Sequence, residues 1–155
     1  GQSMAAVTAR SSLPTAIDAV KALAHPGRLR LLAMLRSGDL CVCQMTAVLE
    51  LAASTVSAHL GDLRRAGLVN ERKRGKWVHY SLVDDGPLAD LVRQALRLVD
   101  DDGQLARDAK VAAALRRVPL AVFCRTGFDR TTVGRISPPG PTPVRRRAAV
   151  TLRQV

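Results

Sequence analysis

The sequence is poor in aromatic residues, histidine and cysteine, and it has no long apolar run free of charge. Aromatic residues make up 3% of the 155 residues, so the core must be built from leucine, valine and alanine, a mixture that favours helices. No stretch of about 18 apolar residues could span a membrane, and the N-terminal residues lack the apolar segment of a secretory signal. We therefore expect a helical, cytoplasmic protein without membrane association.

Acidic residues are scarce in the last quarter of the chain. The formal net charge is +11, but the segment from Arg116 to the end holds nine arginines and one acidic residue, Asp129. Its proline and glycine content is typical of solvated, disordered tails. The rest of the chain is nearly balanced. The positive excess indicates an anionic partner, with nucleic acid first in line.

The length fits one domain with an extension at each end. We expect an N-terminal extension over residues 1–13, whose first three residues precede Met4 and are foreign to the domain. A DNA-binding and dimerisation domain follows over residues 14–118. Residues 119–155 form a C-terminal segment that holds Cys124 and the Pro/Arg-rich tail.

Apolar residues in the first half of the chain recur every three or four positions, which is the helical period. Pro14 and Pro26 each fit the first turn of a helix, and the Ser37-Gly38 pair ends the second helix. Asp39 offers the N-cap of a third helix. A fourth helix is expected from Ser54 to Ala66, closed by Gly67.

The pattern then changes from a helical to a strand period. The stretch LVNERKRGKWVHYSLV alternates apolar and polar residues on both sides of a KRGK tip, as a β-hairpin with a glycine turn does. Two helices joined by a short turn and followed by a basic hairpin form a winged helix-turn-helix. The fold class is therefore mainly α with a β-hairpin wing.

In this arrangement the second helix of the pair lies in the major groove and the hairpin reaches the DNA backbone. Short hydrogen-bonding side chains near the start of that helix suit base edges and phosphates, and nearby basic side chains neutralise phosphates. The expected DNA-binding residues are Ser54, Thr55, Ser57, His59, Arg64, Arg72, Lys73, Arg74 and Lys76.

Three sequence features carry a resemblance to a known family: His25-Pro26 before an Arg/Leu-rich helix, the stretch TVSAHLGDLRRAGLV, and the CVC pair Cys41-Val42-Cys43. Over roughly residues 14 to 115 the chain resembles the ArsR/SmtB family of metal- and metalloid-responsive repressors, and within it the arsenic-responsive branch. The resemblance implies a homodimer, without enzyme activity, that binds operator DNA and leaves it when an inducer binds.

The two cysteines of the pair cannot easily meet on one ion within a regular helix. Residues i and i+2 lie about 200° apart on a helix, whereas in extended chain they lie on the same side. Binding one ion through Cys41 and Cys43 should therefore open the first turn of the third helix. A helix N-terminus favours the thiolate form, and thiolates select soft or thiophilic ions.

The resemblance implies As(III), or alternatively Sb(III), as the inducer, with no organic cofactor. As(III) prefers three sulfurs, but Thr46 stands where the arsenic branch commonly has its third cysteine. Cys124 is the remaining thiol of the chain, and it could come from the same or the partner subunit. The predicted metal ligands are Cys41, Cys43 and Cys124.

Other functions stay open beside this one. A thiol-based redox sensor or a soft-metal (Cd, Pb or Hg) sensor would use the same cysteines. A zinc sensor is disfavoured, because none of the three histidines has a second histidine within a helical turn. The residues from Cys124 to Thr131 fit the C-x-x-G-x-x-R-T pattern of a cysteine-phosphatase loop, so an arsenate-reductase fragment is a remote alternative.

A homodimer is expected from an apolar stripe on the helix that follows the hairpin. The helices near the N-terminus and from Pro87 to about Leu115 should form the interface, because this stripe is too broad for the surface of a monomer: Leu88, Leu91, Val92, Ala95, Leu98 and Val99. Two-fold symmetry then predicts double-stranded operator DNA with an inverted repeat, whose half-sites lie about 34 to 36 Å apart or a multiple of that.

Overall fold

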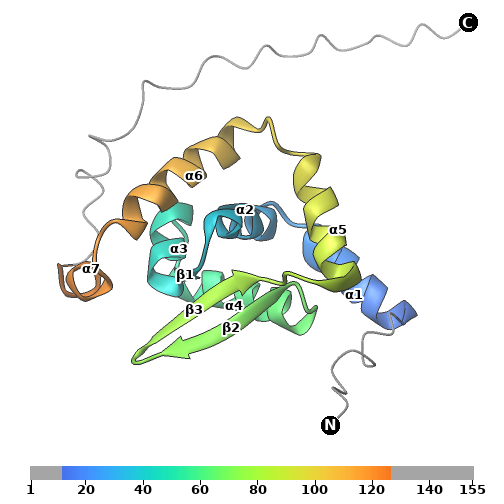
Figure 1. The fold of residues 1–155 in the computed structure, drawn as a ribbon, viewed down its shortest axis with the longest axis horizontal. Helices are drawn as coiled ribbons and strands as arrows, with labels where there is room; N and C mark the ends of the chain where they lie inside the picture. The colour runs from blue at the N-terminus through green and yellow to red at the C-terminus, as the bar shows by residue number, and fades with distance from the viewer. Residues whose placement is uncertain (1–11, 127–155) are drawn as a thin grey trace, which may run out of the picture.

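A computed structural model describes residues 12 to 126 and is mainly helical, with a small sheet along one side (Figure 1). The elements follow one another as α1 (Leu13–Leu23), α2 (Pro26–Met34), the 3-10 turn η2 (Leu35–Ser37), β1 (Leu40–Cys41), α3 (Val42–Leu49), α4 (Ala53–Arg65), β2 (Val69–Arg74), β3 (Trp77–Leu82), α5 (Gly86–Arg97), α6 (Gly103–Arg116) and α7 (Leu120–Thr126). Among the described helices, none is long and apolar enough to cross a membrane.

The first two helices begin at the positions that were predicted from Pro14 and Pro26. Pro14 and Pro26 both lie in first turns, where a missing N–H costs nothing. The capping groups are the hydroxyl of Ser12, which accepts a hydrogen bond from the N–H of Thr15, and the imidazole Nδ1 of His25, which accepts one from the N–H of Gly27 at 3.0 Å. The helix starts proposed for both segments are confirmed.

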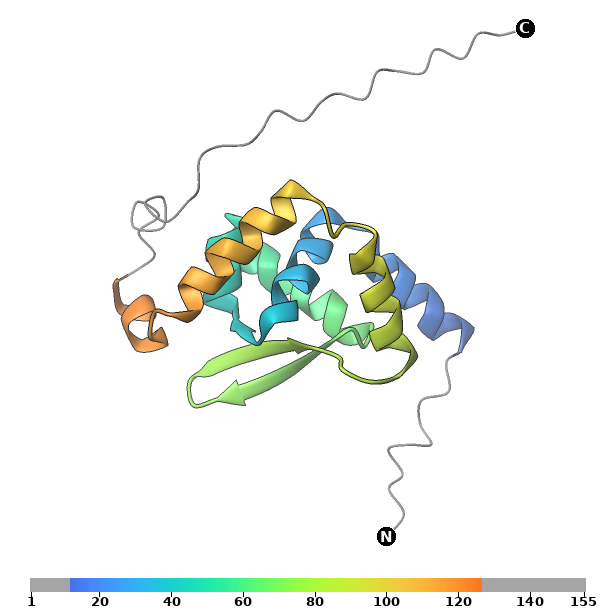
Figure 2. The same cartoon turned by 45° about the horizontal axis from the view of Figure 1, so that its top comes forward.

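Helix α2 lies in the middle of the bundle (Figure 2). It packs against α1, α3, α4, α5 and α6, and Leu31 and Leu32 are completely buried. Leucines of the surrounding helices, such as Leu60, Leu96 and Leu115, complete the core. Since burying one such side chain contributes about 1.5–3 kcal/mol, the leucine-rich core compensates for the scarcity of aromatic residues.

The predicted hairpin is confirmed. Strands β2 and β3 pair in antiparallel register from Val69 opposite Leu82 to Arg74 opposite Trp77. Two residues connect them, and Gly75 supplies the positive φ of +61° that such a tight turn requires. This hairpin is the wing, and it extends away from the helices (Figures 1 and 2).

A third strand was not predicted. Strand β1 pairs with β3, with Leu40 opposite Tyr80 and Cys41 opposite His79, so the sheet order is β1-β3-β2. Two residues are too short to show an alternating pattern. Their extended conformation comes from the partner strand, which the sequence does not reveal locally.

The prediction that Asp39 caps the third helix is wrong. Because residues 40 and 41 belong to the sheet, α3 begins at Val42 and Cys41 is its N-cap, with an extended backbone. The side chain of Gln44 reaches back and accepts a hydrogen bond from the N–H of Cys41 at 2.9 Å. Together with the contact from the N–H of Gln44 to the side chain of Cys41, it forms a capping box.

Helix α4 begins without a side-chain cap. Its N-cap is Ala52, and Ser54 lies inside the first turn. Its end is as predicted: Gly67 has a φ of +78°, and the N–H of Leu68 bonds to the carbonyl of Leu63 at 3.0 Å. Together with the bond from Gly67 to the carbonyl of Arg64, this is a Schellman motif.

A buried ion pair fixes α6 to α2. The guanidinium of Arg30 donates two hydrogen bonds to Asp108, at 2.7 and 3.0 Å, and Asp108 is 3% exposed. Gln104 donates a further bond to the same carboxylate. The hydrogen bond to Asp108 raises the pKa of Arg30. Such two-pronged geometry is the strong form of an Arg–carboxylate contact.

Removing one partner of this pair should destabilise the fold. We expect Asp108→Ala to lower the free energy of unfolding by about 2 to 4 kcal/mol, because it leaves a largely buried guanidinium without its counter-charge. Asp90→Ala is the matched control: it breaks the exposed pair of Asp90 with Arg93 on α5, and should cost less than about 1 kcal/mol. Urea denaturation of both variants measures the difference, and equal losses would contradict it.

Candidate DNA-binding surface and cysteine site

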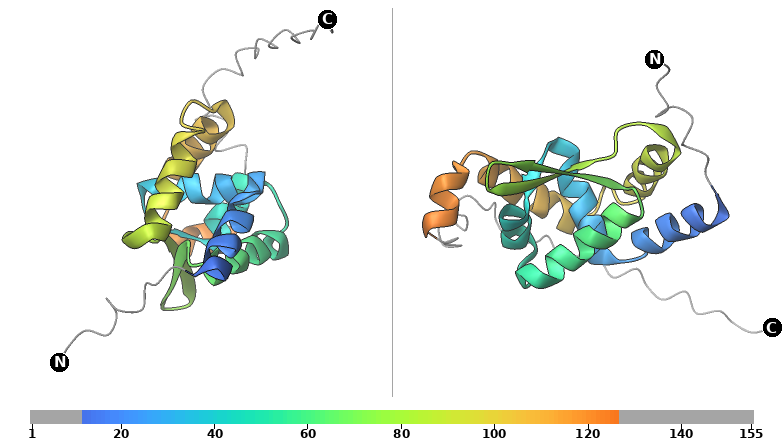
Figure 3. Two further views of the ribbon diagram at one scale, coloured as in Figure 1. Left: turned by 90° about the vertical axis from the view of Figure 1, so that its right-hand side faces the viewer. Right: turned by 90° about the horizontal axis from the view of Figure 1, so that it is seen from below.

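Helices α3 and α4 form the helix-turn-helix. The turn between them contains Glu50 in the left-handed conformation, with a φ of 57°. Seen from below, α4 runs between α3 and α1 and beside the wing (Figure 3). Its inner side is held by Val56, Leu60 and Leu63, which are completely buried. The helix is therefore fixed along its length, with its other side open to solvent.

The structure places most of the predicted DNA-binding residues on this open side and on the wing. Ser54, Thr55 and Ser57 are exposed near the start of α4. The exposed basic residues of the wing are Arg72, Lys73, Arg74 and Lys76. Arg72, Lys73 and Arg74 extend from the antiparallel ribbon, and Lys76 extends from the two-residue turn at its tip.

Two of the predicted basic residues are held by acidic neighbours. Arg64 pairs with Glu71 at 3.3 Å, and Glu71 also accepts a hydrogen bond from the hydroxyl of Tyr80 at 3.1 Å. Arg74 lies 3.5 Å from Asp39. Burial raises the pKa of Tyr80, and its bond to Glu71 adds to this effect. The contacts connect α4, the wing and the segment before Cys41.

His59 differs from the other predicted residues because it is half-buried. Its ring lies against that of His25, with the ring centroids 4.4 Å apart. Burial lowers the pKa of His59 most, the charges of His25 and Arg28 lower it further, and Asp62 opposes them. His59 thus links α4 to the start of α2 and contributes less to the open surface than its neighbours.

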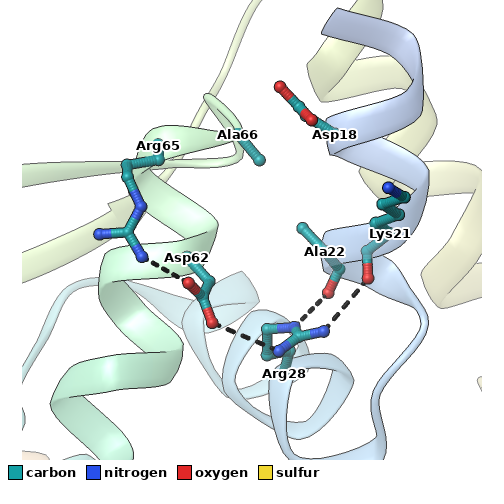
Figure 4. A pocket seen from close by; sticks show the side chains of 7 residues that line it. All are labelled: Asp18, Lys21, Ala22, Arg28, Asp62, Arg65 and Ala66. Carbon is teal, nitrogen blue, oxygen red and sulfur yellow. Dashed lines mark hydrogen bonds and ion pairs between the residues drawn. The ribbon is translucent and has the colours of Figure 1, made fainter. Parts of the chain in front are cut away.

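Arg28 ties three helices together at a pocket of about 310 Å³ (Figure 4). Its guanidinium donates to the carbonyls of Ala22 at 2.6 Å and Lys21 at 3.1 Å, which end α1. It also lies 3.5 Å from the carboxylate of Asp62 on α4, which in turn binds Arg65. No short sequence motif predicted this cluster, because its members come from three separate helices.

The two cysteines of the CVC pair lie in different environments. Cys41 is 2% exposed and belongs to strand β1, whereas Cys43 is exposed in the first turn of α3. One helical turn further on, the hydroxyl oxygen of Thr46 is buried without a hydrogen-bond partner among the described residues. Because the backbone of Cys41 is extended, Cys41 precedes the first turn of α3, which begins at Val42.

The third predicted ligand lies on α7, a helix that was not expected. The side chain of Cys124 is outside the described residues, but the preceding Phe123 belongs to the core. Helices α3 and α7 lie at the same end of the molecule in Figures 1 and 2. Within the side chains that the structure describes, no three histidine, cysteine or acidic residues form a cluster that could hold a metal ion.

The same helix removes support from the phosphatase alternative. A cysteine-phosphatase loop follows a strand, but the residues before Cys124 are helical, and the sheet of the described region is antiparallel. The rest of that motif, residues 127–131, lies outside the described residues.

Arg116, at the end of α6, was also missed by sequence reasoning. Its guanidinium donates to the carbonyl of Met34 at 3.0 Å and to that of Gly38 at 2.7 Å. Burial lowers its pKa. The side chain thus binds the loop that leads from α2 to β1, directly before the cysteine pair.

Most residues of the predicted apolar stripe on α5 pack against the core of their own chain. Val92 is 1% exposed, and Leu88, Leu91 and Val99 pack against the core, so only Leu98, 86% exposed, remains fully outside. The expectation of a broad exposed stripe on α5 is therefore wrong. Helix α1 instead exposes an apolar face, with Leu13, Ile17 and Val20 spaced at four and three residues.

Comparison with known proteins gives one consistent family. Residues 25–71 match the model described as "Bacterial regulatory protein, arsR family". The arsenical resistance operon repressor of Escherichia coli is 35% identical over 103 residues, which cover 66% of this chain and 83% of that protein. The arsenic resistance transcriptional regulator ArsR1 of Pseudomonas putida is 44% identical over 68 residues, covering 43% of this chain and about half (53%) of that protein.

A solved structure agrees with the fold. The homodimeric winged helix-turn-helix DNA-binding domain of Mb0332 from Mycobacterium bovis, described as a possible ArsR-family transcriptional regulator, is 28% identical. The matched region covers 65% of this chain and 90% of the Mb0332 chain, with a TM-score of 0.52. The winged helix-turn-helix fold expected from the sequence is confirmed.

The environment of His59 predicts a pH dependence of stability. Because its pKa in the folded state lies below the ordinary value of 6.5, the unfolded chain takes up its proton first as the pH falls. Stability should therefore decrease below about pH 6.5 until the folded-state pKa is passed. Urea unfolding at pH 7.5 and 5.5 should show a smaller loss for His59→Gln than for the wild type. An NMR titration midpoint of His59 above 6.5 would contradict the prediction.

Proposed function

Because the chain belongs to the arsR family of bacterial regulatory proteins, we propose that it is a homodimeric repressor that releases operator DNA when As(III), or alternatively Sb(III), binds its cysteine thiolates. The observation that carries the proposal is the place of Cys41 and Cys43, one thiol in the wing sheet and the other in the helix that packs on α4. A ligand held by both thiols acts on both DNA-binding elements.

The DNA-binding role rests on the open side of α4 and on the basic wing. We propose that Ser54, Thr55 and Ser57 approach base edges and phosphates in the major groove. The wing residues Arg72, Lys73, Arg74 and Lys76, with Arg64 on α4, would neutralise phosphates. His59, half-buried against His25, would mainly set the position of α4.

The coupling follows from the backbone around the cysteines. We propose that joining both sulfurs through one ion draws Cys41 out of its position in β1 or opens the first turn of α3, since the buried and the exposed thiol lie in different environments. Either change disturbs the pairing of Cys41 with His79 or the packing of α3 on α4. Couplings of this kind are typically about 1 to 3 kcal/mol.

Cys124 is proposed as the third sulfur ligand of As(III). Its support is the position of α7 at the same end of the molecule as α3. This arrangement favours Cys124 of the same subunit. In the proposed domain division, Cys124 lies in the C-terminal segment that follows the core domain of residues 14–118. Thiolate ligands need a reducing compartment, so we propose that the protein acts in the cytoplasm.

The ligand assignment can be tested by DNA release. We expect As(III) to lower the affinity of the reduced wild-type protein for an inverted-repeat promoter fragment by about 5- to 150-fold. Cys41→Ser and Cys43→Ser should abolish this response, and Cys124→Ser should weaken it. Fluorescence anisotropy with and without As(III) measures all four proteins. Retained DNA binding without a response to As(III) would favour a redox or soft-metal sensor instead.

A matched variant separates the role of Cys124 from general damage. Thr46→Cys places a thiol one helical turn after Cys43, so in the Cys124→Ser background it should restore the response to As(III). A full response of Cys124→Ser on its own, with As(III) bound to two sulfurs, would contradict the need for a third thiol. Lack of any DNA binding by the wild type would contradict the repressor function as a whole.

The dimer is proposed to form through the exposed apolar face of α1. We expect Ile17→Glu to convert the dimer into monomers, because a charge would be buried between the subunits. Leu51→Glu is the control: Leu51 is 38% exposed and Ile17 46%, but Leu51 lies at the turn before α4. Light scattering on a sizing column gives the mass, and a monomeric Leu51→Glu with a dimeric Ile17→Glu would refute this interface.

A further inference from the structure

Arg65 is the last residue of α4, the helix expected to enter the major groove. Its side chain is 66% exposed. Positions 54, 58, 61 and 65 lie within about 60° of one another on a helix of 3.6 residues per turn, opposite the buried Val56, Leu60 and Leu63. Arg65 therefore belongs to the centre of the open side of α4.

The guanidinium of Arg65 lies back over Gly61. A Cβ atom placed on Gly61 would come within 3.2 Å of Nη1 of Arg65 and 3.7 Å of its Nη2. Helical side chains point toward the N-terminus of their helix, and the absence of a side chain at Gly61 leaves room for this one. The charged group is thus displaced by about one turn toward the part of α4 expected to enter the groove.

Asp62 fixes this position. It accepts a short hydrogen bond from Nη2 of Arg65, and its other oxygen lies 3.5 Å from Arg28. Arg28 is itself bound to the carbonyls that end α1 (Figure 4). The guanidinium is therefore held in place before DNA arrives, which lowers the entropy lost on binding.

We propose that Arg65 reads a base in the major groove, with guanine as the preferred partner. The inference rests on the proposed DNA-binding role of α4. The guanidinium fork matches the O6 and N7 acceptors of guanine. The neighbouring carboxylate of Asp62 disfavours a phosphate, which is an anion, more than a neutral base edge. Ala58, one turn from Gly61, leaves space for the long side chain where a longer polar residue would compete.

The test selects binding sites from a random DNA pool with the full chain and then compares variants on the selected site. With Arg65→Lys, which keeps the charge but not the fork, the preference for one guanine in each half-site should fall by about 10- to 100-fold. The other positions should keep their preferences. Arg93→Lys is the matched control, because Arg93 forms the same kind of exposed i,i+3 pair with Asp90 on α5.

A second variant keeps Arg65 but displaces its guanidinium from its position over Gly61. Gly61→Ala introduces the Cβ that the guanidinium of Arg65 would meet, in a helix where alanine is the better former. It should reduce the same base preference, with unfolding temperature maintained. Both variants are compared with the wild type at several salt concentrations.

Three outcomes would overturn the inference, and each gives Arg65 or α4 a different role. Equal weakening on all sequences, with the salt slope lower by about one, would make Arg65 a phosphate contact. Unchanged preferences in both variants would make it a surface ion pair only. A wild type that selects no sequence from the pool would remove the proposed DNA-binding function itself, and this inference with it.

Discussion

The packing of α2 among the other helices is the constraint on which the other elements depend. Five helices pack around it, and its leucines occupy the centre of the core with almost no aromatic support. Its polar anchors lie at the periphery: Arg28 reaches α1 and α4, and Arg30 holds α6 through Asp108. The hydrophobic effect supplies the stability, and the arginines fix the orientation of the helices. The position of α4 relative to α1 is therefore set by α2.

Around this core, the segment from Gly38 to Cys41 connects three parts of the protein. Arg116 of α6 binds the carbonyl of Gly38, Asp39 pairs with Arg74 of the wing, and Cys41 pairs with His79 in the sheet. Only four residues thus join the C-terminal helices, the wing and the start of α3. A segment so short cannot move at one end without straining the contacts at the other, which supports the regulatory role proposed for the cysteines.

Local signals in the sequence predicted local structure well. Proline at the helix starts, Gly67 at the end of α4 and the alternation around Gly75 act over a few residues, and the structure confirms each of them. Strand β1, the cap at Cys41 and the contacts of Arg65 depend on partners far away in the chain or on the path of a long side chain. The apolar stripe of α5 was misassigned for the same reason, because Val92 faces the core of its own chain.

The unequal exposure of the two cysteines sets an order of events for any thiol-reactive ligand. Solvent reaches Cys43 first, whereas Cys41 is 2% exposed and held in the sheet. A reagent able to form a single bond can saturate the outer thiol and leave strand β1 in place. A ligand that binds both thiols, as proposed for As(III), must also reach the inner thiol of Cys41. In the proposed sensor, the fold would therefore separate ligands by their valence before their size or charge has any effect.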